Sequence, residues 1–373
     1  MKIVAVDVFP LAHTMDVPRG DARGISRRRQ TTLVRVTSDE GAAGWGQGGS
    51  AETIRRRLAP IVVGQDPRES GRLWRQMARA AARELRSVGA VDVALWDLRG
   101  KLAGLSVAQL LGGALRDRVP AYASLHNYSP SPALDDELTQ TIRAARAAGF
   151  GALKLRVGGR SLPEDVRYAR LAREVAGPHM QLMADANRTY TVPAALRMGR
   201  VLEELDFFWY EEPIEPFDQA GYLRLCAGLD IAIAGGEGIN TPEGIAPVLS
   251  RRALDIYQPD VGGAGGLTAI PTLMAMSAAF GVPATAHCWD QALVQVAALH
   301  LLATVPTWTE GMAASAPRLE VTADPRQPLN YELLTDAPAV GVDGAVPVPT
   351  APGLGVEPNP DVLARYAAPP EGA

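Results

Sequence analysis

Three acidic residues follow apolar, β-rich segments at equal spacing. Asp185 lies in QLMADAN, Glu211 in FFWYEEP and Glu237 in IAIAGGE, and each acid stands 26 residues from the next. A strand, a helix and their connections take roughly 30 residues, so this interval predicts three successive strands of a repeating β/α array. Because the carboxyl ends of parallel strands meet at one face, about 4.8 Å apart, we expect the three acids to converge there.

Converging carboxylates indicate a divalent metal site. Oxygen ligands suit a hard cation, Mg²⁺ first and Mn²⁺ next, and no group of Cys and His that zinc would prefer accompanies the acids. We expect Asn187 and Glu212 to orient the ligands through hydrogen bonds. The alternative is that each acid only caps the helix that follows it, and the equal spacing of three acids argues against this.

Two basic residues lie in an earlier segment, ALKLRV. Side chains alternate along a strand, so Lys154 and Arg156 share one face, and we expect that face to point into the barrel. Two neighbouring buried cations require compensating negative charge, which the acid cluster and an anionic substrate would both provide. A purely structural ion pair remains the alternative.

A histidine and an aspartate follow at the same repeat. Asp260 closes LDIYQPD and His287 lies 27 residues later in PATAHC. A carboxylate bonded to one imidazole nitrogen fixes the tautomer and leaves the other nitrogen as a general base or acid. Glu310, in TWTEGM, is expected to face the same mouth and to bond a substrate carboxylate, with helix capping as its alternative role.

The chain around these residues divides into two kinds of pattern. Residues 1–117 read as strands followed by helices, from Ala51 to Val63 and from Glu69 to about Leu111, which predicts an α+β domain. Residues 118–317 alternate strand and helix, which predicts a parallel barrel with eight strands. The remainder, 318–373, is expected to return to the first domain.

The stretch from Leu11 to Arg29 shows no clear periodicity and is expected to be a long loop. It carries Arg19, Arg23 and the run Arg27 to Arg29. Guanidinium groups suit carboxylates and polyols, which would indicate a sugar acid or a diacid if these side chains faced the barrel mouth. We favour the alternative, that such a run is solvated surface.

Composition restricts the class of partner. The 373 residues are 47% apolar with a net charge of −4, and no basic stripe or membrane-length apolar run is present. We therefore expect a small-molecule partner, and neither nucleic acid nor a membrane. Two cysteines without a paired framework and the absence of a recognisable export signal favour the cytoplasm.

With these residues in place, the chain resembles the enolase superfamily, in its mandelate racemase subgroup, over essentially its whole length. The resemblance assigns metal ligands to Asp185, Glu211 and Glu237, basic strand positions to Lys154 and Arg156, a dyad to His287 and Asp260, and an electrophilic acid to Glu310. The segments ALWDLRGKLAG, LLGG and PGLGVE match as well.

The resemblance implies an α/β fold, a modified (β/α)7β barrel under a capping domain, and likewise a homo-oligomer. It also implies a shared first step, in which a base removes the proton α to a carboxylate and Mg²⁺ stabilises the enediolate. A guanidinium stays protonated in proteins, so Arg156 disfavours racemisation by two bases, although Lys154 could serve as a base if burial beside Arg156 depressed its pKa.

We therefore expect dehydration of a sugar acid, an aldonate or aldarate, to a 2-keto-3-deoxy acid, because the single acid/base residue His287 can remove the α-proton and then protonate the departing hydroxyl. Racemisation, epimerisation and lactone cycloisomerisation are the alternatives within the superfamily. A metal-dependent barrel aldolase and a non-catalytic metal-binding relative are more distant alternatives, because neither requires both the Lys-x-Arg strand and the His-Asp pair.

Overall fold

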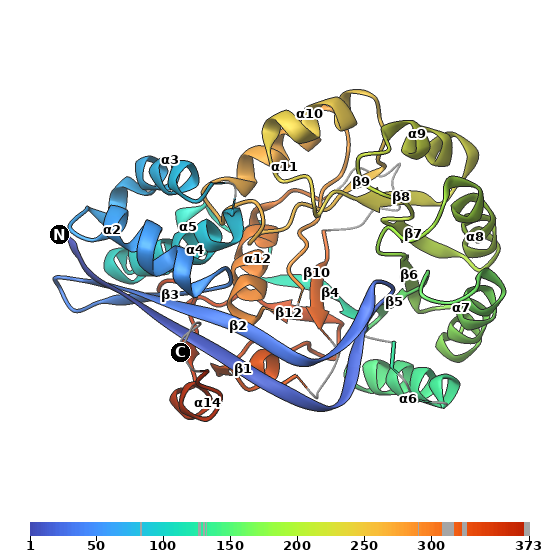
Figure 1. Cartoon of the computed structure of the whole chain (residues 1–373), viewed down its shortest axis with the longest axis horizontal. Helices are drawn as coiled ribbons and strands as arrows, with labels where there is room; N and C mark the ends of the chain where they lie inside the picture. The colour runs from blue at the N-terminus through green and yellow to red at the C-terminus, as the bar shows by residue number, and fades with distance from the viewer. Residues whose placement is uncertain are drawn as a thin grey trace.

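The computed structural model describes residues 1–82, 84–125, 128, 129, 131, 133–289, 291–307, 317–322 and 327–368. An antiparallel sheet with its helices forms an N-terminal cap, and a curled parallel sheet surrounded by helices forms the larger part (Figure 1). Within the described helices, none combines the length and the apolar character that spanning a bilayer requires.

The cap sheet contains β1 (Ile3–Asp21), β2 (Gly24–Ser38) and β3 (Ala43–Gln47). The expected loop between Leu11 and Arg29 is wrong, because β1 and β2 stay paired from Ile3 and Ser38 to Asp21 and Gly24. Contacts with the barrel hold the tip of this hairpin: Gly20 N donates to Tyr128 O, and Arg19 pairs with Glu137. Tertiary anchoring thus orders a segment whose local pattern is weak.

The cap helices lie on one face of this sheet. They are α1 (Ala51–Thr53), the π-helix η1 (Ile54–Leu58), α2 (Ala59–Val62), the 3₁₀-helix η2 (Pro67–Glu69), α3 (Ser70–Ala80), α4 (Leu85–Ala103) and α5 (Val107–Leu110). The predicted second helix is therefore three helices. Helix α4 packs closely on β3 because residue 46 is glycine. A Cβ at this position would lie 1.9 Å from Ala90 O.

The parallel sheet has the order β10-β4-β5-β6-β7-β8-β9. Its strands are β4 (Arg118–Ser124), β5 (Ala152–Arg156), β6 (Gln181–Asp185), β7 (Phe207–Glu211), β8 (Ala232–Gly235), β9 (Ile256–Tyr257) and β10 (Leu319–Thr322). The predicted segment PATAHC runs beside β9 and the residues after it, through parallel bridges from Ala284 to Tyr257 and from His287 to Asp260. The six segments from ALKLRV to PATAHC therefore lie side by side in the predicted order.

The helices of the barrel alternate with these strands. They are α6 (Leu134–Ala147), α7 (Leu162–Ala176), α8 (Val192–Glu204), α9 (Gln219–Gly228), α10 (Pro242–Ser250), α11 (Ile270–Ala279) and α12 (Ala292–Thr304). Inside the sheet, a separate layer of buried side chains fills the barrel: Tyr122, Ala152, Met183, Trp209, Ala234 and Ile256.

The eighth strand differs from the prediction. Residues 308–316, which include most of TWTEGM, lie outside the described residues, and β10 pairs in parallel with β4, Leu319 opposite Ala121. The expected domain limit at residue 317 falls before this strand. We therefore propose that the barrel extends to Thr322, while the limit near residue 117 stays as proposed.

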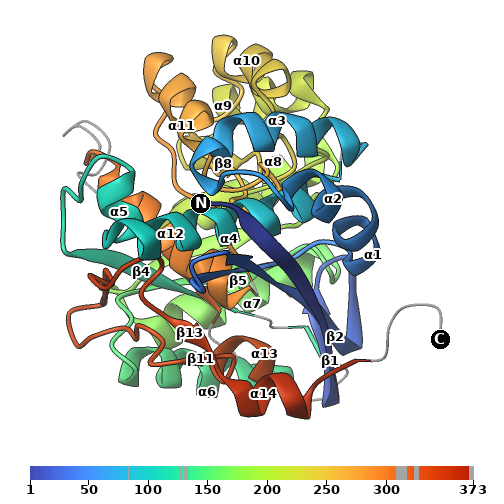
Figure 2. The same cartoon turned by 90° about the vertical axis from the view of Figure 1, so that its left-hand side faces the viewer.

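The C-terminal segment contacts both parts. It contains α13 (Pro328–Tyr331), β11 (Leu334–Thr335), β12 (Ala345–Pro347), β13 (Glu357–Pro358) and α14 (Pro360–Arg365), with β12 antiparallel to β4. Ala12 N of the hairpin donates to Tyr366 O, so α14 lies beside β1, as the view from the cap side shows (Figure 2). Leu354 N donates to Asp97 Oδ1 of α4 at 2.8 Å.

Candidate active site

Two of the three predicted metal ligands end neighbouring strands. Asp185 is the last residue of β6 and Glu211 the last of β7, and the two are directly opposite in the parallel register. Glu237 lies two residues beyond β8, after Gly236 at φ 102°. A Cβ on Gly236 would lie 2.6 Å from the ring of Tyr257, so only glycine allows this turn.

The two basic residues of β5 pair with these acids. Lys154 Nζ lies 2.8 Å from Glu211 Oε1 and 3.7 Å from Asp185 Oδ2, and Arg156 Nη1 bonds Asp185 Oδ2. All four side chains are buried. Such a cluster is tolerated only when every charge has a partner, and the β5 alternation places the partners there.

The pKa of Lys154 differs from the prediction. Burial opposes its charge, but Glu211 and Glu320 outweigh burial and raise the pKa above its ordinary value. The expected depression by Arg156 is a smaller effect. Lys154 is therefore a fixed cation in this arrangement and is poorly suited to act as a base.

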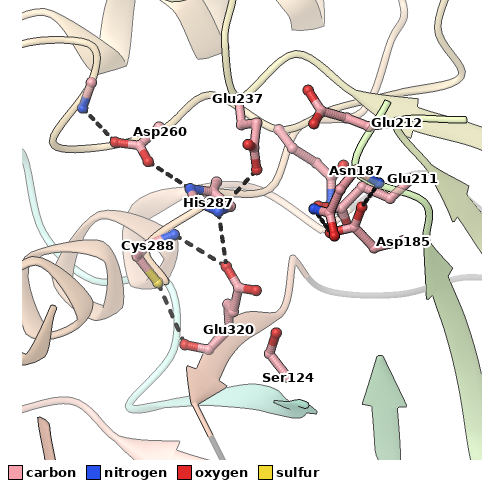
Figure 3. A network of polar contacts seen from close by, with 12 residues as sticks. Ser124, Asp185, Asn187, Glu211, Glu212, Glu237, Asp260, His287, Cys288 and Glu320 are labelled. Atoms are coloured by element: carbon pink, nitrogen blue, oxygen red, sulfur yellow. Dashed lines mark hydrogen bonds and ion pairs between the residues drawn. The ribbon is translucent and has the colours of Figure 1, made fainter. Parts of the chain in front are cut away.

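His287 lies between its predicted partner and the acids (Figure 3). Its Nδ1 is 2.6 Å from Asp260 Oδ2, and its Nε2 is 3.0 Å from Glu237 Oε2 and 3.8 Å from Glu320 Oε2. Burial opposes protonation, but Glu237, Glu320 and Asp260 raise the pKa well above 6.5. Both ring nitrogens thus face carboxylates, Nδ1 that of Asp260 and Nε2 those of Glu237 and Glu320.

Asn187 and Glu212 both adjoin the predicted ligands. The Asn187 backbone N–H and side-chain amide donate to the two oxygens of Asp185, at 2.8 and 3.2 Å. Glu212 accepts from Arg188 Nε at 2.7 Å, and Arg188 also reaches Glu237 at 3.0 Å. Asn187, Arg188 and Glu212 all have positive φ, a strained conformation of the kind found at functional sites.

Sequence reasoning missed two of these residues, Arg188 and Glu320. Glu320 lies on β10, fully buried, with Oε1 3.0 Å from Lys154 Nζ. It is the eighth-strand acid that the structure describes, whereas Glu310 lies outside the described residues. The alternation in RLEVT is a usable signal for a strand, although the sequence predicts that residues 318–373 return to the cap.

A cavity of about 1600 Å³ separates the cap from the barrel on the side of Glu237. Its lining includes Arg23, Arg75 and Arg86 from the cap and Arg188 and Glu237 from the barrel. Of the arginines considered in the hairpin, Arg23 therefore reaches the cavity. Arg19 is buried against Glu137, and Arg27 and Arg28 are exposed, as the surface alternative expected.

The residues fit a hard divalent cation by charge and by donor type. Burial, and after it repulsion from Glu237, raises the pKa of Glu212 to about 7. Asn187 Oδ1 and Glu212 Oε1 are buried and make no hydrogen bond within the described part of the chain. Asp185, Glu211 and Glu237 are the residues that would hold the cation.

The three acids do not have the predicted convergent geometry. No group of three His, Cys, Asp or Glu side chains among the described residues is arranged to hold a metal ion. Each acid instead faces a cation, Arg156 for Asp185, Lys154 for Glu211, and Arg188 with His287 for Glu237. The three ligand assignments therefore stay predictions.

Comparison with known proteins identifies the family. Residues 3–112 match the N-terminal domain of mandelate racemase and muconate lactonizing enzyme, and residues 137–362 match the enolase C-terminal domain-like family. The chain is 33% identical to D-galactarolactone cycloisomerase of Agrobacterium fabrum, over 99% of this chain and 100% of that protein. It is 30% identical to arabinonate dehydratase of Saccharolobus solfataricus, over 90% of each chain.

A solved structure agrees along the whole chain. The crystal structure of a racemase from Streptomyces coelicolor with bound magnesium superposes with a TM-score of 0.87 at 28% identity, covering 98% of this chain and 100% of that one. The three relatives carry three different reaction names, while the fold and the chain order are shared. The chain therefore belongs to the enolase superfamily, in its mandelate racemase and muconate lactonizing enzyme subgroup.

Proposed function

We propose that this enzyme removes the proton α to the carboxylate of an acid sugar and then expels an oxygen from the β-carbon, most simply as water. The observation that carries the proposal is the position of His287, whose Nδ1 is held by Asp260 while Nε2 faces the acid cluster. Two of the relatives are named for acid sugars, one a dehydratase and one a cycloisomerase.

In the first step His287 Nε2 takes the proton from Cα, and the C–H electron pair moves into the carboxylate to form an enediolate. Mg²⁺ held by Asp185, Glu211 and Glu237 would supply positive charge to that enediolate and would remove the charge of Glu237 from His287. Lys154 and Arg156 add fixed positive charge on the β5 side.

In the second step the enediolate electrons form the Cα–Cβ double bond, and the Cβ–O bond breaks. The imidazolium of His287 gives its proton to the departing oxygen, which leaves as water. The enol then tautomerises to a 2-keto-3-deoxy acid. One residue can serve both steps because the proton that it takes is the proton that it returns.

Racemisation needs a second base on the opposite face of Cα. The β5 residues are poorly suited to this role, because Arg156 is a guanidinium and Lys154 is ion-paired with buried carboxylates. We therefore rank racemisation and epimerisation below elimination, although one related structure is that of a racemase.

Cycloisomerisation is the second candidate, favoured by the relative that matches along its entire length. In that case the base acts in the same way, and a ring oxygen of a lactone replaces hydroxide as the group that departs. The product then keeps the mass of the substrate, whereas dehydration loses one water.

The deciding experiment incubates the enzyme and Mg²⁺ with a panel of aldonates, aldarates and their lactones. Semicarbazide detects 2-keto products, and mass spectrometry tells loss of water from isomerisation. We expect a ketone with loss of water from at least one open-chain acid sugar. Ketone formation only from lactones at unchanged mass would favour the cycloisomerase, and isomerised substrate without any ketone would exclude dehydration.

A further inference from the structure

The Asp260 carboxylate receives a contact from the cap as well as from the barrel. Arg86, in the first turn of α4, has Nη2 3.2 Å from Asp260 Oδ2, the same oxygen that bonds His287 Nδ1. The other oxygen, Oδ1, accepts from Gly263 N. Arg86 and Gly263 thus hold the carboxylate from two directions.

The backbone of Arg86 is itself fixed. Ser87 Oγ donates to Glu84 Oε1 at 2.6 Å, and Ser50 N donates to both Glu84 and Ser87. These bonds tie the first turn of α4 to Ser50, the N-cap residue of α1. The guanidinium therefore starts from a rigid anchor, although its side chain is 50% exposed to the cavity.

The loop after Asp260 is held by the same helix and its neighbour. Trp74 Nε1 of α3 donates to Gly265 O at 2.7 Å, and Thr268 N donates to Asp92 Oδ2 of α4 at 2.9 Å. A Cβ on Gly89 of α4 would lie 2.5 Å from Gly262 O, so helix and loop are in backbone contact. Cap and dyad therefore form one packed unit, in which Arg86 makes the contact to Asp260.

We infer that Arg86 is a positioning residue: from the cap it orients the Asp260 carboxylate, which in turn holds the His287 ring for proton transfer. This inference rests on the proposed role of His287. It makes the capping domain part of the acid/base machinery and not only a wall of the substrate cavity. The contact is a single N–H to oxygen interaction, which a lysine ammonium can replace.

The test compares Arg86→Met and Arg86→Lys with Arg79→Met in the intact enzyme. Arg79 is an exposed arginine of α3 that is not among the residues lining the cavity, so it is the matched control. We expect Arg86→Met to lower kcat by about 10- to 100-fold, as outer groups that orient catalytic ones do, with KM little changed. Arg86→Lys should recover most of kcat, and Arg79→Met should keep it.

A double-mutant cycle tests whether Arg86 acts through Asp260. In the Asp260→Asn background, Arg86→Met should cause no further loss, since the group that it orients is already altered. Equal losses in both backgrounds would overturn the inference, as would a parental kcat in Arg86→Met. A raised KM with unchanged kcat would instead make Arg86 a substrate-binding residue.

A second readout needs no substrate. The proton on His287 Nδ1, identified by its loss in His287→Asn, should give a low-field NMR signal that Arg86→Met shifts or broadens and Arg79→Met leaves in place. An unchanged signal in Arg86→Met overturns the inference. If the parent enzyme leaves every acid sugar unchanged, the proposed function fails while this measurement still decides the role of Arg86.

Discussion

Lys154 Nζ lies 3.0 Å from Glu320 Oε1, an ion pair that joins the second strand of the barrel to its eighth. The same ammonium contacts Glu211 of β7. The buried Lys154 of β5 therefore links its own strand to β7 and β10. Because desolvation makes an unpaired buried charge costly, this pairing sets how the ends of the sheet can close around the site.

The first prediction concerns that cation. Lys154→Met leaves Glu211 and Glu320 buried without their shared partner, so we expect a loss of about 3–5 kcal/mol in the free energy of unfolding. Urea denaturation in the presence of a chelator measures it. Lys2→Met, at an exposed position, is the control and should unfold like the parent. Equal stability of the two variants would contradict the view that the cluster depends on Lys154.

The second prediction concerns the metal. Dialysis against a chelator should abolish turnover, and Mg²⁺ should restore it, with Mn²⁺ next. Glu237→Gln should weaken Mg²⁺ binding in calorimetry, because one charged ligand is lost, whereas Glu243→Gln in the same cavity wall should bind normally. Full turnover by metal-free protein would remove the basis for the assignment of Asp185, Glu211 and Glu237.

The third prediction concerns the dyad. His287→Asn should lower kcat by about 10²- to 10⁴-fold while substrate binding persists, since general acid/base catalysis contributes about that much. Asp260→Asn should cost as much or less, because it misorients the ring without removing it. Turnover by His287→Asn near the parental rate would assign proton transfer to another group.

The fourth prediction concerns stereochemistry. With one base on one face of Cα, substrate recovered from deuterated solvent should show no inversion, even where the α-proton has exchanged. Chiral separation of recovered substrate with isotope analysis measures both. Appearance of both epimers at equal rates would show a second base and restore the racemase alternative.

The fifth prediction concerns pH and His300, which lies in α12 away from the site. Its Nδ1 accepts from Ala108 N and its Nε2 donates to Leu354 O, so the folded protein holds it neutral. Burial lowers its pKa to about 4 from 6.5. Between these values the unfolded chain binds more protons, so stability is full above pH 6.5 and falls as the pH drops toward 4.

The size of this effect is on the order of 3 kcal/mol at most, from a shift of about 2.5 pKa units. Urea midpoints between pH 4 and pH 7 measure it. His300→Gln removes the titrating group and should flatten the dependence of the urea midpoint on pH. His13→Gln, at the cap hairpin, is the comparison because it also removes a histidine but leaves His300 in place. A profile that keeps its slope in His300→Gln would assign the dependence to other groups.

The sequence by itself determined the order of the barrel segments from ALKLRV to PATAHC and the acids at the ends of β6 and β7. Asp185, Glu211 and Glu237 are each 26 residues apart because each β/α unit has nearly constant length. Side-chain alternation along β5 places Lys154 and Arg156 on the same face of the strand. The parallel neighbour relation of Asp260 and His287 followed in the same way. These features are local in origin, since they depend only on repeat length and side-chain alternation.

The tertiary structure decided what depends on contacts between distant segments. The hairpin from Ile3 to Ser38 is ordered by its anchors on the barrel, and Glu320 joins the site because β10 pairs with β4. Arg86 reaches Asp260 across 174 positions of sequence. No local pattern encodes such pairings, because the free energy that selects them comes from contacts between segments far apart in the sequence.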